Sequence, residues 1–269
     1  IKTKAMGSMT SSLTLLRFIH LSPGASKDYL SSHTLTLLNP HTYPSNADTL
    51  SIHLPSSAIS HLSDERILAL FTKGFFGGPI FRIESWLLRA GLWKIIGIPQ
   101  EATQAAQQIW DVSKISTERM LPLYSTVEGA FQVLESHLPS EEHHHPQYSF
   151  IDFSYGTSTS HFAGNHRFIV RRPSSLSSPW QLLDPQHPQS ANPSEDEEVA
   201  LLQESMTDSL CKDDVEIRLE MYYCDPIHPK GTWATKVNWF HTLYGRLLFW
   251  EGVRRVVRGG EEERQRKQA

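Results

Sequence analysis

The chain has 269 residues, with 25 Lys plus Arg against 29 Asp plus Glu, and its formal net charge is −4. Hydrophobic residues make up 39%, which excludes a wholly disordered chain and leaves ample surface to bury in one large domain or two small ones. The mild acidity excludes a generally basic protein, so no nucleic acid is expected as a partner. Cys211 and Cys224 are the only cysteines and form no C-x-x-C pair, so a reduced, cytoplasmic setting is expected.

Neither end of the chain predicts targeting to a membrane. Residues 1–8 read as a cloning remnant ahead of a native start at Met9. Arg17 and His20 interrupt the apolar run that a signal peptide would need. The most apolar stretch, residues 71–98, carries five charged side chains, so no transmembrane segment is expected.

The region before residue 56 predicts short, extended elements. Apolar runs at 13–21 and 33–38, separated by Pro23-Gly24, indicate either two strands or one strand with an irregular arm. Residues 50–54 alternate in polarity, which is typical of a strand.

Residues 56–110 predict an inserted helical block. Ser63 is followed by two acidic residues that favour the start of a helix, and glycines within 74–78 then interrupt it. A second helix is expected from Pro79, a residue favoured in the first turn. Its apolar positions follow the helical period: Ile80, Ile83, Trp86, Leu87 and Ala90. Residues 101–110, rich in Ala and Gln, predict a third, short helix.

The pattern changes to strands near residue 127. Five strand-like runs lie at 127–134, 148–155, 165–172, 180–183 and 215–223. The last run alternates charged and apolar residues, which predicts one buried and one solvated face. Such runs, spaced by turns, favour an antiparallel meander, and the polar segments between them read as solvated loops.

The last element is predicted as a helix over residues 236–258. It carries an apolar stripe and a second face of small side chains that includes Gly245 and Gly252. Because glycine weakens a helix, these glycines indicate close approach to a neighbour. The charged residues 259–269 are expected to form a frayed tail beyond the domain, which spans 9–258.

One segment resembles a known family. Residues 150–171 contain Phe153, Tyr155-Gly156-Thr157, His161, Gly164, Phe168 and Val170. These positions resemble the F-x-Y-G-T…H…G-x-x-x-F-x-V segment of an uncharacterised family of bacteria and plants, placed near the START-like, helix-grip proteins. Asn165 and His166 replace the acidic pair usual in that family. The chain also resembles, more weakly, the orphan cyclases of fungal natural-product pathways.

The resemblance implies an α+β fold, in which a curved antiparallel sheet grips a long C-terminal helix around an apolar pocket. Helix-grip relatives use that pocket for sterols, polyketides, lipids or hormones, and some are cyclases. The helical block at 56–110 has no counterpart in this resemblance, and its aromatic residues read either as core or as a lid hinged at the glycines.

Candidate site residues follow from polar-tipped side chains on elements that would line such a pocket. The expected catalytic donors are Tyr155, Thr157, His161 and His241. The expected substrate-binding residues are Phe76, Trp86, Phe153, Tyr222, Trp239 and Tyr244. Packing alone is the alternative for each of the aromatic residues, with Gly156 forming a bulge. A metal site formed by His161, His166 and Asp152 matches no standard spacing, so no metal is expected.

Nucleotide, dinucleotide, serine-hydrolase and zinc-protease motifs are absent from the sequence, so no cofactor is expected. The favoured function is a cofactor-independent enzyme of secondary metabolism. It would catalyse a cyclisation, isomerisation or cycloaddition of a hydrophobic small-molecule substrate in an enclosed pocket. Two alternatives stay open: a carrier that binds a hydrophobic ligand without chemistry, and an interaction protein whose aromatic helices dock a partner or a membrane. The sequence sets no oligomeric state.

Overall fold

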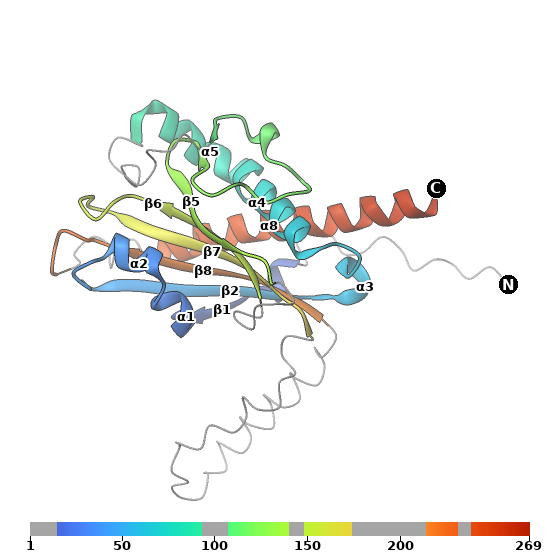
Figure 1. Ribbon diagram of the computed structural model, residues 1–269, viewed down its shortest axis with the longest axis horizontal. Helices are drawn as coiled ribbons and strands as arrows, with labels where there is room; N and C mark the ends of the chain where they lie inside the picture. The colour runs from blue at the N-terminus through green and yellow to red at the C-terminus, as the bar shows by residue number, and fades with distance from the viewer. Residues whose placement is uncertain (1–14, 93–106, 140–147, 174–213, 231–237) are drawn as a thin grey trace, which may run out of the picture.

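The computed structural model describes residues 15–92, 107–139, 148–173, 214–230 and 238–269, without the side chains of 91, 92 and 238–240. The predicted strand at 180–183 and the expected remnant at 1–8 lie outside these residues. The fold is the predicted α+β class, a curved open sheet of eight strands with a long C-terminal helix (Figure 1).

The strand order across the sheet is β1-β2-β8-β7-β6-β5-β4-β3, and every pair except β3 with β4 is antiparallel. The strands are β1 His20–Pro23, β2 Ser45–Pro55, β3 Gln108–Ile109, β4 Thr126–Val127, β5 Phe131–His137, β6 Ser149–Tyr155, β7 Ala163–Arg171 and β8 Asp214–Cys224. The predicted meander is confirmed from β5 to β8. The predicted strand at 50–54 is the end of β2, which pairs with β8 along its whole length.

Two predicted elements of the first half are wrong. Residues 33–38 form a helix, α2 (His33–Leu38), because the Ser32 hydroxyl accepts a hydrogen bond from the Leu35 amide and caps its first turn. Of the expected helix at 101–110, residues 101–106 lie outside the described residues, and Gln108 and Ile109 form β3, which pairs with β4. The other short helical elements are η1 Leu15–Phe18, α1 Lys27–Leu30, α3 Ser56–Ile59, the π-helical turn η2 Leu88–Leu92 and η3 Val112–Lys114.

Two long helices cover one face of the sheet, α4 (Asp64–Gly77) and α8 (Asn238–Gln268), and they lie side by side (Figure 1). Their backbones approach closely at glycines. A Cβ on Gly74 would lie 2.7 Å from the Glu251 carbonyl oxygen, and one on Gly252 would lie 2.6 Å from the Phe71 ring. The predicted close approach at Gly252 is therefore confirmed. The predicted interruption within 74–78 is also confirmed, but it falls at Gly78, between the end of α4 and the start of α5, and not at Gly74.

Aromatic rings from α4 fill the layer between sheet and helices, where an apolar pocket is expected from the sequence. Phe71 lies 4.8 Å from Phe168 between ring centroids, and Phe76 lies 4.9 Å from Phe153. All four rings are fully buried, and Phe249 of α8 joins them. Burial on this scale is the main source of the stability of the fold. The helical block predicted as an insert therefore supplies the centre of the core and is not a peripheral addition to the fold.

The opposite face of the sheet is also buried, which corrects the expectation of a solvated polar face on β8. Helices α1 and α2 cover it (Figure 1), and Tyr29 of α1 is fully buried there. Glu220 of β8 accepts hydrogen bonds from the backbone amide and the hydroxyl of Ser26, at 3.1 and 3.0 Å. Glu220 on this face is therefore buried and hydrogen-bonded to the N-cap residue of α1, rather than exposed to water.

Helix α5 (Pro79–Leu87) begins at Pro79 as predicted, but its exposed and buried faces differ from the prediction. Ile83 and Trp86 are about two-thirds exposed, at 66% and 68%, whereas Phe81 is buried. Most of the apolar stripe predicted from the sequence therefore faces away from the core, and Ile80 is the member of it that packs against the core.

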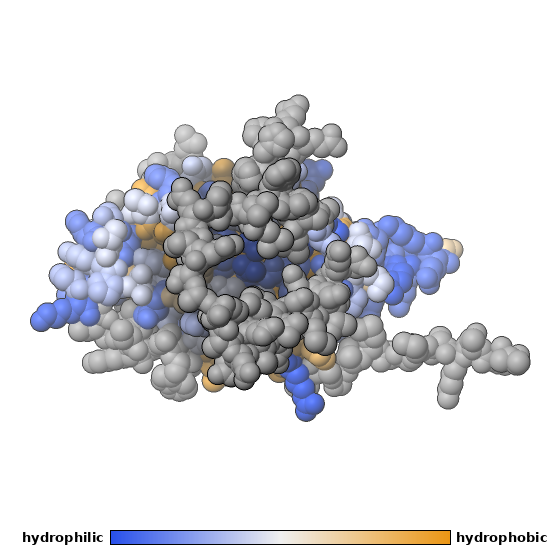
Figure 2. Space-filling model, turned by 90° about the horizontal axis from the view of Figure 1, so that it is seen from below, coloured by the Kyte–Doolittle hydropathy of each residue, from blue (hydrophilic) through white to orange (hydrophobic). Residues whose placement is uncertain are grey.

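The expected frayed tail is instead the last part of α8, which continues to Gln268. A Cβ on Gly259 would lie 2.6 Å from the Leu70 side chain. The Gly260 carbonyl lies 2.9 Å from His61 Nε2, and Glu263 accepts a hydrogen bond from Arg66 at 3.0 Å. These contacts hold the charged end of the helix, whose surface is strongly hydrophilic (Figure 2). In the part of the chain that is described, no helix is long and apolar enough to cross a membrane.

Candidate functional site

Five polar-tipped side chains gather at one end of the layer between sheet and helices. Tyr155 ends β6 and His166 lies in β7, while His241 and Tyr244 lie one turn apart on α8. Glu84 reaches the same place from the inner side of α5. Four different elements thus bring these groups together, which no local sequence pattern could do.

The contacts within this cluster are short. The Tyr155 hydroxyl lies 3.5 Å from His241 Nε2, and the Tyr244 hydroxyl donates a hydrogen bond to Glu84 at 2.5 Å. The His166 ring lies 5.3 Å from the Tyr155 ring and 5.8 Å from the His241 ring, between centroids. Two contacts of hydrogen-bond length therefore join the cluster in pairs, and His166 contacts Tyr155 and His241 through its ring.

His166 is the unusual member. Both of its ring nitrogens are buried and find no hydrogen-bond partner within the described residues, and the same holds for His241 Nδ1. An imidazole always offers at least one donor or acceptor, and leaving such a group buried and unpaired costs about 1–3 kcal/mol. The fold therefore accepts an energetic cost here, and such costs concentrate at functional sites.

Burial sets the protonation states of the cluster. It lowers the pKa of His241 to about 4 and that of His166 well below its usual value, with a small further contribution from His241. It raises the pKa of Glu84 to about 7, against the opposing effect of the Tyr244 hydrogen bond. At neutral pH both imidazoles are therefore uncharged, while Glu84 is divided between acid and base forms.

The cluster runs from the surface to the core. Tyr155 and His166 are buried, whereas Glu84, His241 and Tyr244 are partly exposed. Gly164, which pairs with Tyr155 across β6 and β7, leaves room for the Tyr155 hydroxyl, because a Cβ there would overlap it. The Tyr-Gly-Thr segment and Gly164 of the sequence motif thus position one member of the cluster.

Three of the predicted site residues, Tyr155, His241 and Tyr244, are brought together in this cluster. Phe76 and Phe153 lie in the aromatic core, in contact with each other. Sequence reasoning missed Glu84 and assigned no catalytic role to His166. Glu84 could have been found from its spacing. It lies three residues after Phe81 and four before Leu88, so its carboxylate is on the buried face of the helix.

The remaining predicted site residues lie elsewhere. The Tyr222 hydroxyl is on the opposite face of the sheet, 2.8 Å from the Asn39 side-chain amide that donates to it. The Thr157 hydroxyl lies 2.9 Å from that of Thr159 within the turn after β6. Trp86 is exposed on α5, and the Trp239 side chain lies outside the described residues.

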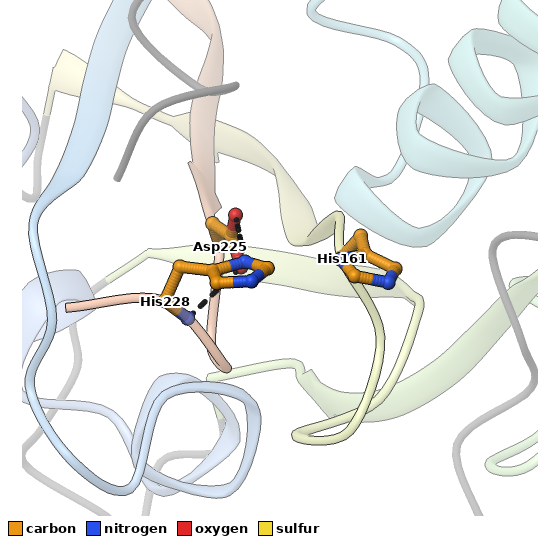
Figure 3. Close-up of side chains that lie close together, drawn as sticks. All are labelled: His161, Asp225 and His228. Carbon is orange, nitrogen blue, oxygen red and sulfur yellow. Dashed lines mark hydrogen bonds and ion pairs between the residues drawn. The ribbon is translucent and has the colours of Figure 1, made fainter. Parts of the chain in front are cut away.

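The metal site weighed from the sequence does not assemble. Asp152 faces α1 and binds Arg167 with two hydrogen bonds of 2.7 Å, and His166 lies in the cluster on the other face. His161 instead lies beside Asp225 and His228 at the end of β8 (Figure 3), and sequence reasoning missed both of these neighbours.

A separate groove of about 800 Å³ lies outside the core, between α4, α5, α8 and residues 110–113. Six basic and three acidic side chains line it: Lys73, Arg82, Arg89, Arg254, Arg255, Arg258, Asp111, Glu128 and Glu251. Trp86 and Trp110 also line it, and they are 68% and 43% exposed. On a chain of net negative charge, this groove is locally basic and partly aromatic.

Searches against protein-family models, curated proteins and solved structures find no match to this chain.

Proposed function

We propose that the protein is a cofactor-independent acid–base enzyme that isomerises or cyclises a small, largely apolar substrate at the Glu84–Tyr155–His166–His241–Tyr244 cluster. The observation that carries the proposal is the buried, unpaired imidazole of His166 beside the imidazole of His241, in a cluster that also contains a carboxylate of raised pKa, Glu84. In this proposal a substrate enters beside the partly exposed His241 and Tyr244, and the rings packed on His166 move apart to admit it. A polar group of the substrate would then satisfy the imidazole nitrogens, while the surrounding rings would bind its apolar part.

Three of the five members of the cluster carry the chemical steps in this proposal. Glu84, whose pKa lies near 7, accepts a proton from a carbon next to a carbonyl group. Tyr155 and the neutral His241 donate hydrogen bonds to the oxygen on which negative charge develops. The proton then returns to another carbon of the same molecule, so the product has the mass of the substrate and no oxidant or reductant is needed.

A generic substrate tests the acid–base chemistry of Glu84. In 5-nitrobenzisoxazole, removal of one carbon-bound proton breaks the N–O bond and releases a coloured phenolate. We expect Glu84→Gln to lower kcat/KM for this reaction by about 10²- to 10⁴-fold. Activity of the unaltered protein should rise with pH through about 7, as the Glu84 carboxylate ionises, and the variant should lose that rise.

The matched control is Glu261→Gln, which changes an exposed glutamate on α8 and should leave the rate and its pH profile unchanged. Incubation with mixtures of polyketide and terpenoid ketones then seeks products of unchanged mass and altered retention time. A protein that binds such ketones, yet performs neither reaction, would be a carrier without chemistry.

The groove favours a second candidate function, the binding of an anionic molecule with an aromatic or apolar part. Its basic side chains would bind the anionic group, and Trp86 and Trp110 would pack on the apolar part. This ligand class differs from the neutral, hydrophobic ligand expected from the sequence.

The fluorescent probe 1-anilinonaphthalene-8-sulfonate has this combination of an anion and aromatic rings. We expect saturable binding that weakens at least about tenfold in Arg82→Ala/Arg258→Ala, because two unit charges at the groove are lost. Lys27→Ala, which removes an exposed charge on α1, is the control. Equal binding of the parent compound without the sulfonate would contradict an anion-selective groove.

A further inference from the structure

A second cluster of chemically active side chains lies at the far end of β8, where strand pairing brings two separate turns together. Ala163 of β7 pairs with Cys224 of β8. Because the strands are antiparallel, the residues that lead into Ala163, His161 and Phe162, lie at the same end of the two strands as the residues that follow Cys224. His161 therefore lies beside Asp225 and the turn that carries His228 (Figure 3).

The three side chains point toward a common space. One nitrogen from each histidine and one carboxylate oxygen all lie within 4.8 Å of one another. The two imidazole rings are nearly parallel, with centroids 5.2 Å apart and planes inclined by 22°. Ligand atoms around a tetrahedral zinc ion lie about 3.4 Å apart, so closing the cluster onto an ion needs movements on the order of 1 Å.

The cluster combines one fixed ligand with two adjustable ones. Asp225 is 1% exposed, and its carboxylate accepts hydrogen bonds from the backbone amides of Ile227 and His228 at 3.3 and 3.2 Å. His161 is exposed and the His228 side chain is half exposed, so both rings can rotate toward an ion. A positive ion would also offset the cost of keeping the Asp225 carboxylate away from water.

We propose that His161, Asp225 and His228 bind one divalent transition-metal ion of the zinc class, with water completing its coordination. Two imidazoles and one carboxylate are ligands that zinc, cobalt and nickel favour, whereas magnesium and calcium favour oxygen ligands alone. Three protein ligands leave a position open to water or to another molecule, which is typical of reactive rather than purely structural zinc sites. This site is independent of the acid–base cluster proposed above.

Titration of the full chain with Zn²⁺ by calorimetry, and with Co²⁺ by visible absorbance, tests the proposal. The sequence also contains three consecutive histidines, His143 to His145, which can bind metal ions by themselves. Every protein tested therefore carries serine at those three positions. In this background we expect one ion per chain.

Replacing His161 separates metal binding from a structural role, because its side chain is exposed and its loss should not unfold the chain. His161→Ala should weaken binding at least about tenfold, the smallest loss usual when a metal's environment is altered. His161→Cys should retain Zn²⁺ binding, since a thiolate is an equally good zinc ligand. His53→Ala, an exposed histidine of β2, is the matched control and should bind as the background does.

His228 Nδ1 already lies 2.9 Å from the Asp225 carboxylate, and this pair without a metal is the competing explanation of the cluster. If the serine background binds no ion, or if His161→Ala and His228→Ala bind Zn²⁺ as tightly as the background, the metal site does not exist. Failure of the acid–base tests on Glu84 would leave these titrations unaffected.

Discussion

Arg167→Met is expected to destabilise the folded protein by about 3–5 kcal/mol, because it leaves the buried Asp152 carboxylate without its cation. The guanidinium is 4% exposed and binds the fully buried Asp152 through two hydrogen bonds of 2.7 Å. It also lies 3.3 Å from Glu135 and over the Phe150 ring, 4.0 Å from its centroid. Chemical denaturation with urea at pH 7 measures the loss.

Two further variants decide whether the unpaired charge is the cause. Arg255→Met breaks a partly exposed pair with Glu262, whose atoms lie 3.5 Å apart, and should cost no more than about 1 kcal/mol. Arg167→Met combined with Asp152→Leu removes both charges of the buried pair and should recover part of the lost stability. A cost below 1 kcal/mol for Arg167→Met alone would contradict this account of the sheet face under α1.

The face of the sheet that holds this ion pair also shows how far the fold can be predicted from the sequence. The strands β5 to β8 and the helix α8 could be predicted, because alternation and helical period are local patterns. The position of Glu220 could not, since the alternation of β8 is the same whether its polar face meets water or α1. The bonds from Ser26 that bury Glu220 join residues 194 positions apart. Contacts at that separation leave no periodic trace in the sequence.

The aromatic core likewise depends on contacts between residues far apart in the sequence. Phe71, Phe75 and Phe76 are evident as an apolar run, and Gly252 as a contact point on the last helix. That α4, rather than α8 alone, lies on β6 and β7 depends on Gly74, whose missing side chain lets the two helices approach. The sequence does not give the distance between α4 and α8, so it is compatible with a hollow and with a packed layer alike. In the structure the rings of α4 fill that layer.

The candidate cluster could be predicted in part. The sequence predicts three of its members, Tyr155, His241 and Tyr244, because they are polar-tipped aromatic residues on elements expected to face one another. His166 could not be predicted, because its place depends on the register in which it pairs with Phe153 and Met221, its neighbours on β6 and β8. A change of register by one residue would move its ring to the opposite face of the sheet.

His166→Phe is expected to stabilise the protein by about 1–3 kcal/mol at pH 7, although it removes a member of the proposed site. The ring of His166 lies among aromatic rings, 5.7 Å from Phe75 and 6.2 Å from Phe131 between centroids. Phenylalanine keeps those contacts and removes nitrogens that have no partner within the described chain. Urea denaturation of both proteins gives the difference in unfolding free energy.

The difference should increase as the pH falls. Burial lowers the pKa of His166 in the folded protein, so between about pH 6.5 and the folded value only the unfolded chain binds the proton. The unaltered protein therefore loses stability as the pH falls below about 6.5, and His166→Phe lacks this loss. Glu84 and His241 titrate in both proteins, so their contributions largely cancel in the difference.

His53→Phe, at an exposed position of β2, is the control and should show no such pH-dependent difference. If His166→Phe is less stable than the unaltered protein at both pH 7 and pH 5, the imidazole has a stabilising partner and is not an unsatisfied group. If it is more stable and has also lost activity toward 5-nitrobenzisoxazole, the imidazole is retained at a cost in stability. A residue retained on those terms serves the chemistry of the site, because packing alone would favour phenylalanine.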